Sequence, residues 1–356
     1  MGSLRYIGSK ARVVDQIIEA VGAPTGYDGH FIDLFSGTGV VSREAGLRGW
    51  KVRANDHLLS SSLITQAQLV CHEDVPFQYF GGYLAALMQL TAAPVIEGFI
   101  TAEYSPGGHS RSGHARRYFT TANAKAIDGM RAAIRRWREA GLLAPLEEAL
   151  LLADLLLAVN GVANTAGTYG CFLNAWDTTA LKPIQLSPRL LLAQKCDFVV
   201  SNLDSFALAA SPADVVYIDP PYTKRQYAAY YHLLETISAG DSPVVGGVTG
   251  LRPWEEKSSP FCYKRRALKA FESLLTNLRA ERIFISYSAE GHVALADLSE
   301  LLSRFGVVET IPLGKIGRYR PNEVACNNGD GVSEFLISLN KTERSASTAH
   351  ELSCYA

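Results

Sequence analysis

Four consecutive residues, Asp219-Pro220-Pro221-Tyr222, carry groups that could act directly on a ligand. They follow the apolar run of residues 215–218, which is typical of a buried strand. Proline has no amide hydrogen and a fixed φ, so the strand cannot continue through the two prolines. The resulting turn presents a carboxylate, free backbone carbonyls and an aromatic face, which together can grip a planar base by its amino group. The alternative is an ordinary strand-ending turn, where Asp and Pro are common.

A glycine-containing turn is the second candidate site. It follows a short apolar run that begins at residue 31 and precedes a predicted helix, as in the first βα unit of nucleotide-binding folds, where glycines let the backbone approach a ligand. Ser42 stands where a dinucleotide fingerprint has its third glycine, so a dinucleotide is not implied. The turn consists of Phe35, Ser36, Gly37, Thr38 and Gly39.

Two acidic residues follow the next predicted strands. Asp56 comes about twenty residues after Gly37, the spacing at which an acid accepts hydrogen bonds from ribose hydroxyls. Asp204 and Phe206 flank the rim that the glycine turn faces, where they could bond an adenine amino group and pack its ring. The alternative for Asp204 is a helix cap. The glycine turn and these residues predict an adenosine site.

Basic residues gather between residues 105 and 138, where Asp128 is the only acid. Such a cluster can neutralise phosphates of a nucleic acid and would make binding salt-dependent. The alternative is a solvated helix face whose arginine stems cover apolar surface. A second basic group follows the loop of residues 241–260. The predicted DNA contacts in the two groups are Arg111, Arg116, Arg117, Lys125, Lys264 and Arg265.

Strands and helices alternate at both ends of the chain but not between residues 58 and 195, where the patterns are mainly helical. We therefore expect an insertion between the second and third strands. The predicted strands begin at residue 31 and cover residues 51–55, 197–201, 215–218, 282–287, 307–311 and 333–339. The predicted helices of the insertion cover residues 60–71, 79–89, 123–139 and 146–160. The polar tail, residues 341–356, is expected to be disordered.

The composition is that of an ordinary soluble globular protein. The 356 residues are 47% hydrophobic and carry a net charge of −1, so a local patch must meet any anionic partner. The six cysteines are scattered without a Cys-x-x-Cys pair, which indicates reduced thiols in an intracellular protein and no zinc or other metal site. We find no signal peptide and no apolar stretch long enough to span a membrane.

In their order along the chain, these motifs resemble those of the Dam-like (alpha-group) adenine-specific DNA methyltransferases. The matching segments are Arg5-Tyr6-Ile7-Gly8-Ser9-Lys10, the glycine turn, Asn55-Asp56, Asp204 and Asp219-Pro220-Pro221-Tyr222. The resemblance implies a Rossmann-like α/β fold with a seven-stranded, mostly parallel sheet whose last strand is antiparallel. Residues 1–57 and 196–340 would form the catalytic domain, and the helical insertion of residues 58–195 would recognise the target.

The resemblance also implies S-adenosylmethionine as cofactor. Tyr6 and Lys10 would contact its methionine end, and the glycine turn would wrap it. Relatives often carry Trp where Tyr6 stands and Glu where Asp33 stands. The cofactor-binding residues implied are Tyr6, Lys10, Asp33, Phe35, Ser36, Gly37, Thr38, Gly39, Asp56, Asp204 and Phe206.

The expected reaction is direct methylation of an adenine amino group, with double-stranded DNA as partner. Asp219 and the Pro220 carbonyl would accept hydrogen bonds from that group, and Tyr222 would stack on the flipped base. Two alternatives stay open: methylation of a cytosine amino group or an RNA base, and a catalytically silent DNA-binding relative. Cytosine-amino enzymes more often have Ser at the position of Asp219. The resemblance places the protein on DNA in a prokaryotic cytoplasm, with a cognate restriction endonuclease as a candidate partner and no indication of oligomeric state.

Overall fold

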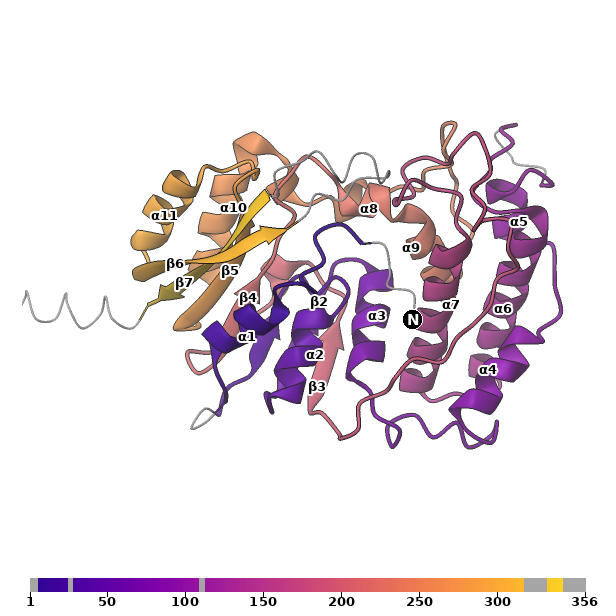
Figure 1. Cartoon of the computed structure of the whole chain (residues 1–356), viewed down its shortest axis with the longest axis horizontal. Helices are drawn as coiled ribbons and strands as arrows, with labels where there is room; N and C mark the ends of the chain where they lie inside the picture. Colours follow the sequence, from indigo (N-terminus) through magenta and orange to yellow (C-terminus); the bar gives the residue numbers. More distant parts are fainter. Residues whose placement is uncertain (1–5, 25–27, 109–112, 317–331, 342–356) are drawn as a thin grey trace, which may run out of the picture. The chain divides into compact units, whose positions relative to one another are not determined.

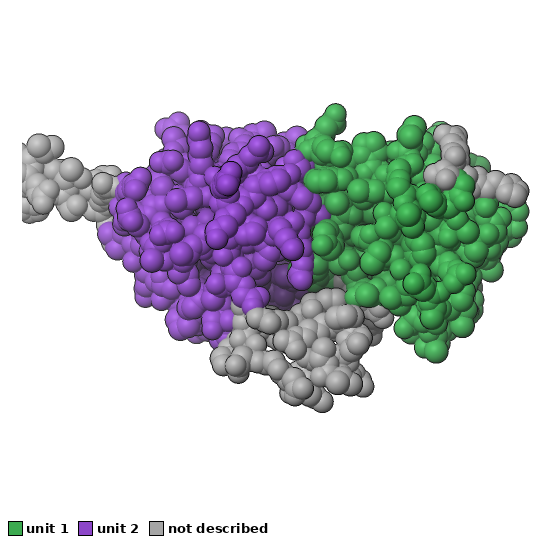
Figure 2. All heavy atoms as spheres, turned by 90° about the horizontal axis from the view of Figure 1, so that it is seen from above, with its two compact units in different colours: residues 1–7, 58–195, 227–257 green, residues 8–57, 196–226, 258–356 purple. Residues whose placement is uncertain are grey.

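The computed structural model describes residues 6–24, 28–108, 113–316 and 332–341, and the chain divides into two compact units (Figure 2). The helical unit comprises residues 1–7, 58–195 and 227–257, and the sheet unit comprises residues 8–57, 196–226 and 258–356. Within the described residues, no helix is long and apolar enough to cross a membrane. The same residues contain no group of three or more His, Cys, Asp or Glu side chains that could hold a metal ion.

The sheet unit is built on seven strands in the order β3-β2-β1-β4-β5-β7-β6 (Figure 1). The strands are β1 Phe31–Asp33, β2 Val52–Asn55, β3 Phe198–Ser201, β4 Val215–Ile218, β5 Arg282–Ser288, β6 Val307–Ile316 and β7 Val332–Asn340. From β3 to β5 neighbouring strands pair in parallel, whereas β7 runs antiparallel to both β5 and β6. The predicted mostly parallel sheet with an antiparallel last strand is therefore confirmed.

Helices cover both faces of this sheet, which explains why its inner strands are continuous apolar runs. On one face α10 (Lys264–Asn277) and α11 (Leu295–Ser303) pack on Ile32, Val216 and Ile283. Successive strand residues point to opposite faces, so Phe31, Asp33 and Tyr217 point to the other side. There Phe31 packs beside Trp50, and α2 (Val40–Leu47) lies on β1 and β2 with α1 (Val14–Val21) next to it.

The helical unit packs around α7 (Pro145–Val162), which contacts α3, α6 and α9. Most α7 residues are buried, including Leu150, Leu151 and Leu155, as expected for a helix that is apolar on all sides. The other helices are α3 Leu59–Leu69, α4 Tyr83–Thr91, α5 Phe99–Tyr104, α6 Thr121–Glu139, α8 Tyr227–Tyr230 and α9 His232–Ala239. The unit thus takes in residues 227–257 in addition to the predicted insertion.

Strand order reverses between β1 and β4 in the sheet unit. These strands pair in parallel with Asp33 opposite Tyr217, so the segments that follow them leave the sheet side by side. The glycine turn follows β1, and residues 219–222 follow β4. In open parallel sheets, ligands bind outside the carboxyl ends of the strands at such a reversal. The topology therefore places two predicted motifs at the edge where a ligand is expected.

Candidate active site

Asp219 lies immediately after β4, and its carboxylate pairs with Lys10. Nζ of Lys10 is 2.9 Å from Oδ1 of Asp219, and the two side chains are only 3% and 16% exposed. Burial raises the pKa of Asp219 to about 6, although Lys10 opposes this rise. Asp219 is therefore a carboxylate at neutral pH that can accept hydrogen bonds from an amino group. The predicted cofactor residue Lys10 thus contacts the predicted catalytic acid.

The other residues of the tetrapeptide are held close to this pair. Pro220 is buried and Pro221 is half-buried. The Tyr222 hydroxyl donates a hydrogen bond of 2.9 Å to Oε1 of Glu334 on β7. The other oxygen of this carboxylate, Oε2, is 3.6 Å from Nζ of Lys10. Glu334 was not predicted from the sequence, because only the pairing of β7 with β5 brings it here.

The glycine turn is tied to the end of β2. Gly37 and Gly39 have φ values of 52° and 74°, in the left-handed region that glycine adopts without strain. The Gly37 amide donates to Oδ2 of Asp56 at 2.9 Å, and the Ser36 amide donates to the Asn55 carbonyl at 2.9 Å. The side chains of Ser36 and Thr38 are buried, and α2 begins directly after Gly39. The turn thus brings the predicted ribose-binding acid against the glycines.

Asp33, at the end of β1, has one carboxylate oxygen in use and one available. Oδ2 accepts a 2.7 Å hydrogen bond from Ser42, whereas Oδ1 is buried and accepts none from the described residues. Burial raises the pKa of this carboxyl to about 7. A buried acceptor left open beside a glycine turn suits a ligand that donates hydrogen bonds. S-adenosylmethionine, with its ammonium group and ribose hydroxyls, fits this donor–acceptor set.

Two predicted aromatic residues share one neighbour at this edge. Phe206 stacks on Phe261 with ring centroids 6.0 Å apart, and Phe35 meets the same ring edge-on at 5.7 Å. Both Phe35 and Phe206 are half-buried, so they can offer apolar surface to a planar ring. The exposed carboxylate of Asp204 accepts a 3.1 Å hydrogen bond from the Phe206 amide, which is the capping geometry considered as its alternative. Phe261 was missed because it lies in a short 3₁₀-helix, Pro260–Cys262, that carries no motif.

Tyr6 belongs to the helical unit. Its ring stacks on Tyr231 with centroids 4.6 Å apart, and its hydroxyl lies 3.1 Å from Oγ of Ser61. The Ile7 amide donates a 2.8 Å hydrogen bond to the Tyr231 hydroxyl. These contacts anchor the segment that leads to Lys10.

Arg116 corrects the predicted DNA interface. Its side chain is completely buried and pairs with Glu103 at 2.8 Å. The guanidinium also donates to the carbonyls of Glu103, Gly247 and Val248. The Arg116 guanidinium thus donates hydrogen bonds to groups inside the protein. The prediction that Arg116 contacts DNA is therefore wrong in this structure. The residue instead links separate segments of the helical unit.

The other predicted DNA contacts have different surroundings. Arg117 is exposed and donates to the Asn174 carbonyl, and Lys125 pairs with Glu97. Lys264 and Arg265 are exposed in the first turn of α10. Arg111 lies outside the described residues, as does the predicted tail beyond Lys341.

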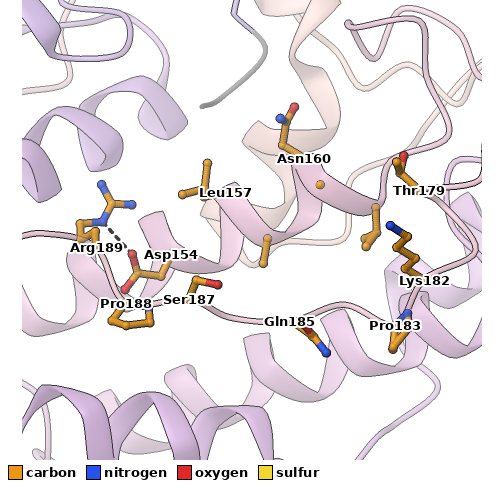
Figure 3. A pocket seen from close by; sticks show the side chains of 13 residues that line it. Asp154, Leu157, Asn160, Thr179, Lys182, Pro183, Gln185, Ser187, Pro188 and Arg189 are labelled. Atoms are coloured by element: carbon orange, nitrogen blue, oxygen red, sulfur yellow. Dashed lines mark hydrogen bonds and ion pairs between the residues drawn. The ribbon is translucent and has the colours of Figure 1, made fainter. Parts of the chain in front are cut away.

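A separate cavity of about 420 Å³ lies in the helical unit, between α7 and residues 179–189 (Figure 3). Asp154 and Arg189 pair at one end, with Nε of Arg189 2.7 Å from Oδ1 of Asp154. Asn160, Thr179 and Lys182 contribute polar groups elsewhere in its lining. None of the site residues predicted from the sequence lines this cavity.

Comparison with known proteins gives consistent matches. A family model described as D12 class N6 adenine-specific DNA methyltransferase matches residues 6–287. The chain is 36% identical over 345 residues to the type II methyltransferase M.FokI of Planomicrobium okeanokoites, covering 95% of this chain and 53% of that protein. It is 33% identical over 350 residues to the type II methyltransferase M.NlaIII of Neisseria lactamica, covering 95% of this chain and 100% of that protein. The modification methylase StsI of Streptococcus sanguinis is 32% identical, covering 95% of this chain and 52% of that protein. The chain thus spans about half the length of M.FokI and of StsI.

Proposed function

Since the chain belongs to the D12 class N6 adenine-specific DNA methyltransferases, we propose that it transfers a methyl group to the exocyclic amino nitrogen of adenine in double-stranded DNA. One observation carries this proposal: β1 and β4 are adjacent and parallel, so the glycine turn and Asp219 share one edge of the sheet. We infer that S-adenosylmethionine is the methyl donor. The open acceptor of Asp33 and the contact between Gly37 and Asp56 support this choice.

The chain's residues would act mainly by orientation and charge. S-adenosylmethionine supplies, when bound, a methyl group on a positively charged sulfur. The adenine amino nitrogen is a poor nucleophile because its lone pair is delocalised into the ring. Hydrogen bonds to the Asp219 carboxylate and the Pro220 carbonyl would favour a pyramidal nitrogen and stabilise the positive charge that develops on it. Tyr222 would stack on the base once it has left the duplex.

A methyl-transfer assay tests the proposal. The wild-type chain is incubated with tritium-labelled S-adenosylmethionine and with either duplex DNA or RNA. We expect label in DNA as N6-methyladenine, and we expect Asp219→Ala to lose about 10³-fold or more in rate while still binding the donor. Asp197→Ala, at an exposed position before β3, is the matched control and should keep wild-type activity.

Full activity of Asp219→Ala would contradict the proposed grip on the amino group. Label in cytosine or in RNA would favour the same chemistry on another base. If no nucleic acid gains label although the donor binds, a catalytically silent DNA-binding protein is the better description.

We also propose that the methylation protects DNA from a cognate restriction endonuclease. The relatives named type II methyltransferases or modification methylases support this proposal. DNA from cells that express the chain would be sequenced for methylated bases and digested with a panel of restriction endonucleases. Methylation at one short sequence, with resistance to endonucleases that cut there, is the expected result. Methylation without sequence preference would contradict it.

A further inference from the structure

Glu334 is a buried carboxylate for which the proposed mechanism has no role. It lies near the start of β7, is 4% exposed and stands opposite Ser288 of β5. Burying a carboxylate costs free energy unless hydrogen bonds and an opposite charge compensate it. The partners of Glu334 therefore indicate what the side chain does, and both partners belong to the candidate active site.

The first partner is Tyr222, whose hydroxyl donates to Oε1 of Glu334 at 2.9 Å. The backbone carbonyl of Tyr222 accepts a 2.8 Å hydrogen bond from the His292 amide, and its ring meets Tyr287 edge-on at a centroid distance of 5.7 Å. The ring is thus fixed at its hydroxyl, at its backbone and along one side. Without the hydroxyl contact, its plane could rotate more freely about the side-chain bonds.

The second partner is Lys10. Oε2 of Glu334 lies 3.6 Å from Nζ of Lys10, which is itself 2.9 Å from Oδ1 of Asp219. Oε2 accepts no hydrogen bond from the described residues, so Lys10 supplies its charge compensation. One buried ammonium is thus shared between two carboxylates. If Asp219 turns to the adenine amino group, Glu334 still pairs with Lys10, and no buried cation is left uncompensated.

We propose that Glu334 is a positioning residue for methyl transfer, which fixes the ring plane of Tyr222 and retains Lys10 beside Asp219. This inference rests on the proposed function. Glu334 itself touches neither the base nor the donor in this scheme, and it acts through its two partners. Its removal should therefore slow the transfer step more than it weakens binding of either substrate.

The test compares Glu334→Gln with Glu309→Gln, a matched change at an exposed position of β6 in the same unit. Single-turnover methyl transfer to DNA is measured from pH 5 to 9, together with donor affinity and thermal unfolding. The groups that act electrostatically on or with Asp219 are Lys10, Glu334, Asp33 of β1, Tyr217 of β4 and Tyr222. Glu334→Gln removes only one of these charges.

We expect Glu334→Gln to lower the rate about 10- to 100-fold with donor affinity within about twofold of wild type. Because the Glu334 charge raises the pKa of Asp219, the acidic limb of the profile should also move to lower pH. Glu309→Gln should match wild type in every measurement. A wild-type rate and profile in Glu334→Gln would overturn the inference. A slower rate in Glu334→Gln would also overturn it if thermal stability is lost and the acidic limb of the profile stays at the wild-type pH.

A wild-type chain that methylates no DNA would instead refute the proposed function, so the two failures are distinguishable. If Glu334→Gln does not fold, Tyr222→Phe carries the test, because it removes the same hydrogen bond and keeps the ring. A rate about tenfold or more below wild type, with donor affinity kept, would support the inference. A wild-type rate would overturn it.

Discussion

Lys10 and Asp219 form a buried ion pair, with Nζ of the lysine 2.9 Å from Oδ1 of the acid. They are separated by more than two hundred residues in the sequence and belong to the same compact unit. The lysine lowers the pKa of an acid whose burial raises it to about 6. The pair thus keeps Asp219 ionised at neutral pH, and a pH–rate profile can test its contribution.

The first prediction concerns this profile. Only ionised Asp219 can offer both oxygens as acceptors, so the wild-type rate should rise with pH through about 6 and fall about tenfold between pH 7 and pH 5. Lys10→Met removes the charge that lowers the pKa, so its acidic limb should move to higher pH, with at least a tenfold loss of rate at pH 7. Lys51→Met, at an exposed position before β2, is the control. If the acidic limb of the pH–rate profile lies at the same pH in wild type and Lys10→Met, the prediction is contradicted.

The second prediction concerns Asp33 and stability. Its pKa is raised in the folded chain from 3.8 to about 7 by burial, so the folded state binds a proton more tightly than the unfolded state. The favourable contribution of this protonation is present at low pH and is lost as the pH rises towards 7. Asp33→Asn should therefore be more stable than wild type at pH 8, on the order of 4 kcal/mol, and similar to it at pH 4.

Urea unfolding without cofactor at the two pH values measures this difference. Asp197→Asn, at an exposed position of the same unit, should show no such pH-dependent gain. Equal stabilities of Asp33→Asn and wild type at pH 8 would show that burial does not raise the pKa of Asp33. We also expect Asp33→Asn to bind S-adenosylmethionine more weakly at pH 8, where Asp33 is ionised, because it exchanges a charged acceptor for a neutral one.

The third prediction separates two adjacent arginines. Arg116→Met removes the buried ion pair with Glu103 and should lower the free energy of unfolding by about 3–5 kcal/mol. Arg117→Met, at an exposed position, should change it by less than about 0.5 kcal/mol. Thermal unfolding measures both. If Arg116→Met keeps wild-type stability but loses affinity for DNA, its assignment to internal structure is wrong.

The fourth prediction concerns the start of α10. If Lys264 and Arg265 contact DNA phosphates, the double substitution to alanine should weaken DNA binding and reduce the slope of log K against log salt by about 2. Donor affinity should not change. Lys51→Ala is the control, because it precedes β2 and so lies at the opposite edge of the sheet. An unchanged slope, measured by fluorescence anisotropy over a range of salt concentrations, would exclude phosphate contacts at these two residues.

Most of the sheet could be predicted from the sequence, because its strands are apolar runs bounded by turn residues. All seven predicted strands are present, and β4 has the predicted bounds, since Pro220 and Pro221 end it sharply. Helix ends were less exact. The sequence also predicts one helix over residues 226–238, but the structure divides this segment into α8 and α9, with Tyr231 between them. Hydrophobic periodicity shows which face of a helix is buried but not where the helix is interrupted.

The candidate site was predictable where its residues stand in compact motifs, as with Asp219 and the glycine turn. Arg116 shows that a cluster of basic residues in the sequence does not by itself identify which of them contact DNA. Two of the three carbonyls that accept hydrogen bonds from it lie at residues 247 and 248, more than a hundred positions away, and only tertiary structure identifies them. Glu334 shows the converse limit. It is one acid at the start of an apolar strand, and strand register alone brings it to Tyr222.

The position of β7 between β5 and β6 has a consequence for how the protein is made. Lys10 and the Asp219 tetrapeptide are synthesised long before Glu334. The strand that carries Glu334, β7, must then insert between β5 and β6, which are synthesised before it. If Glu334 supports the chemistry as we infer, Lys10, Asp219 and Tyr222 lack their contacts with Glu334 in the nascent chain until β7 has paired with β5 and β6. Methylating competence is then gained only after β7 has been synthesised, in one step with its pairing between β5 and β6.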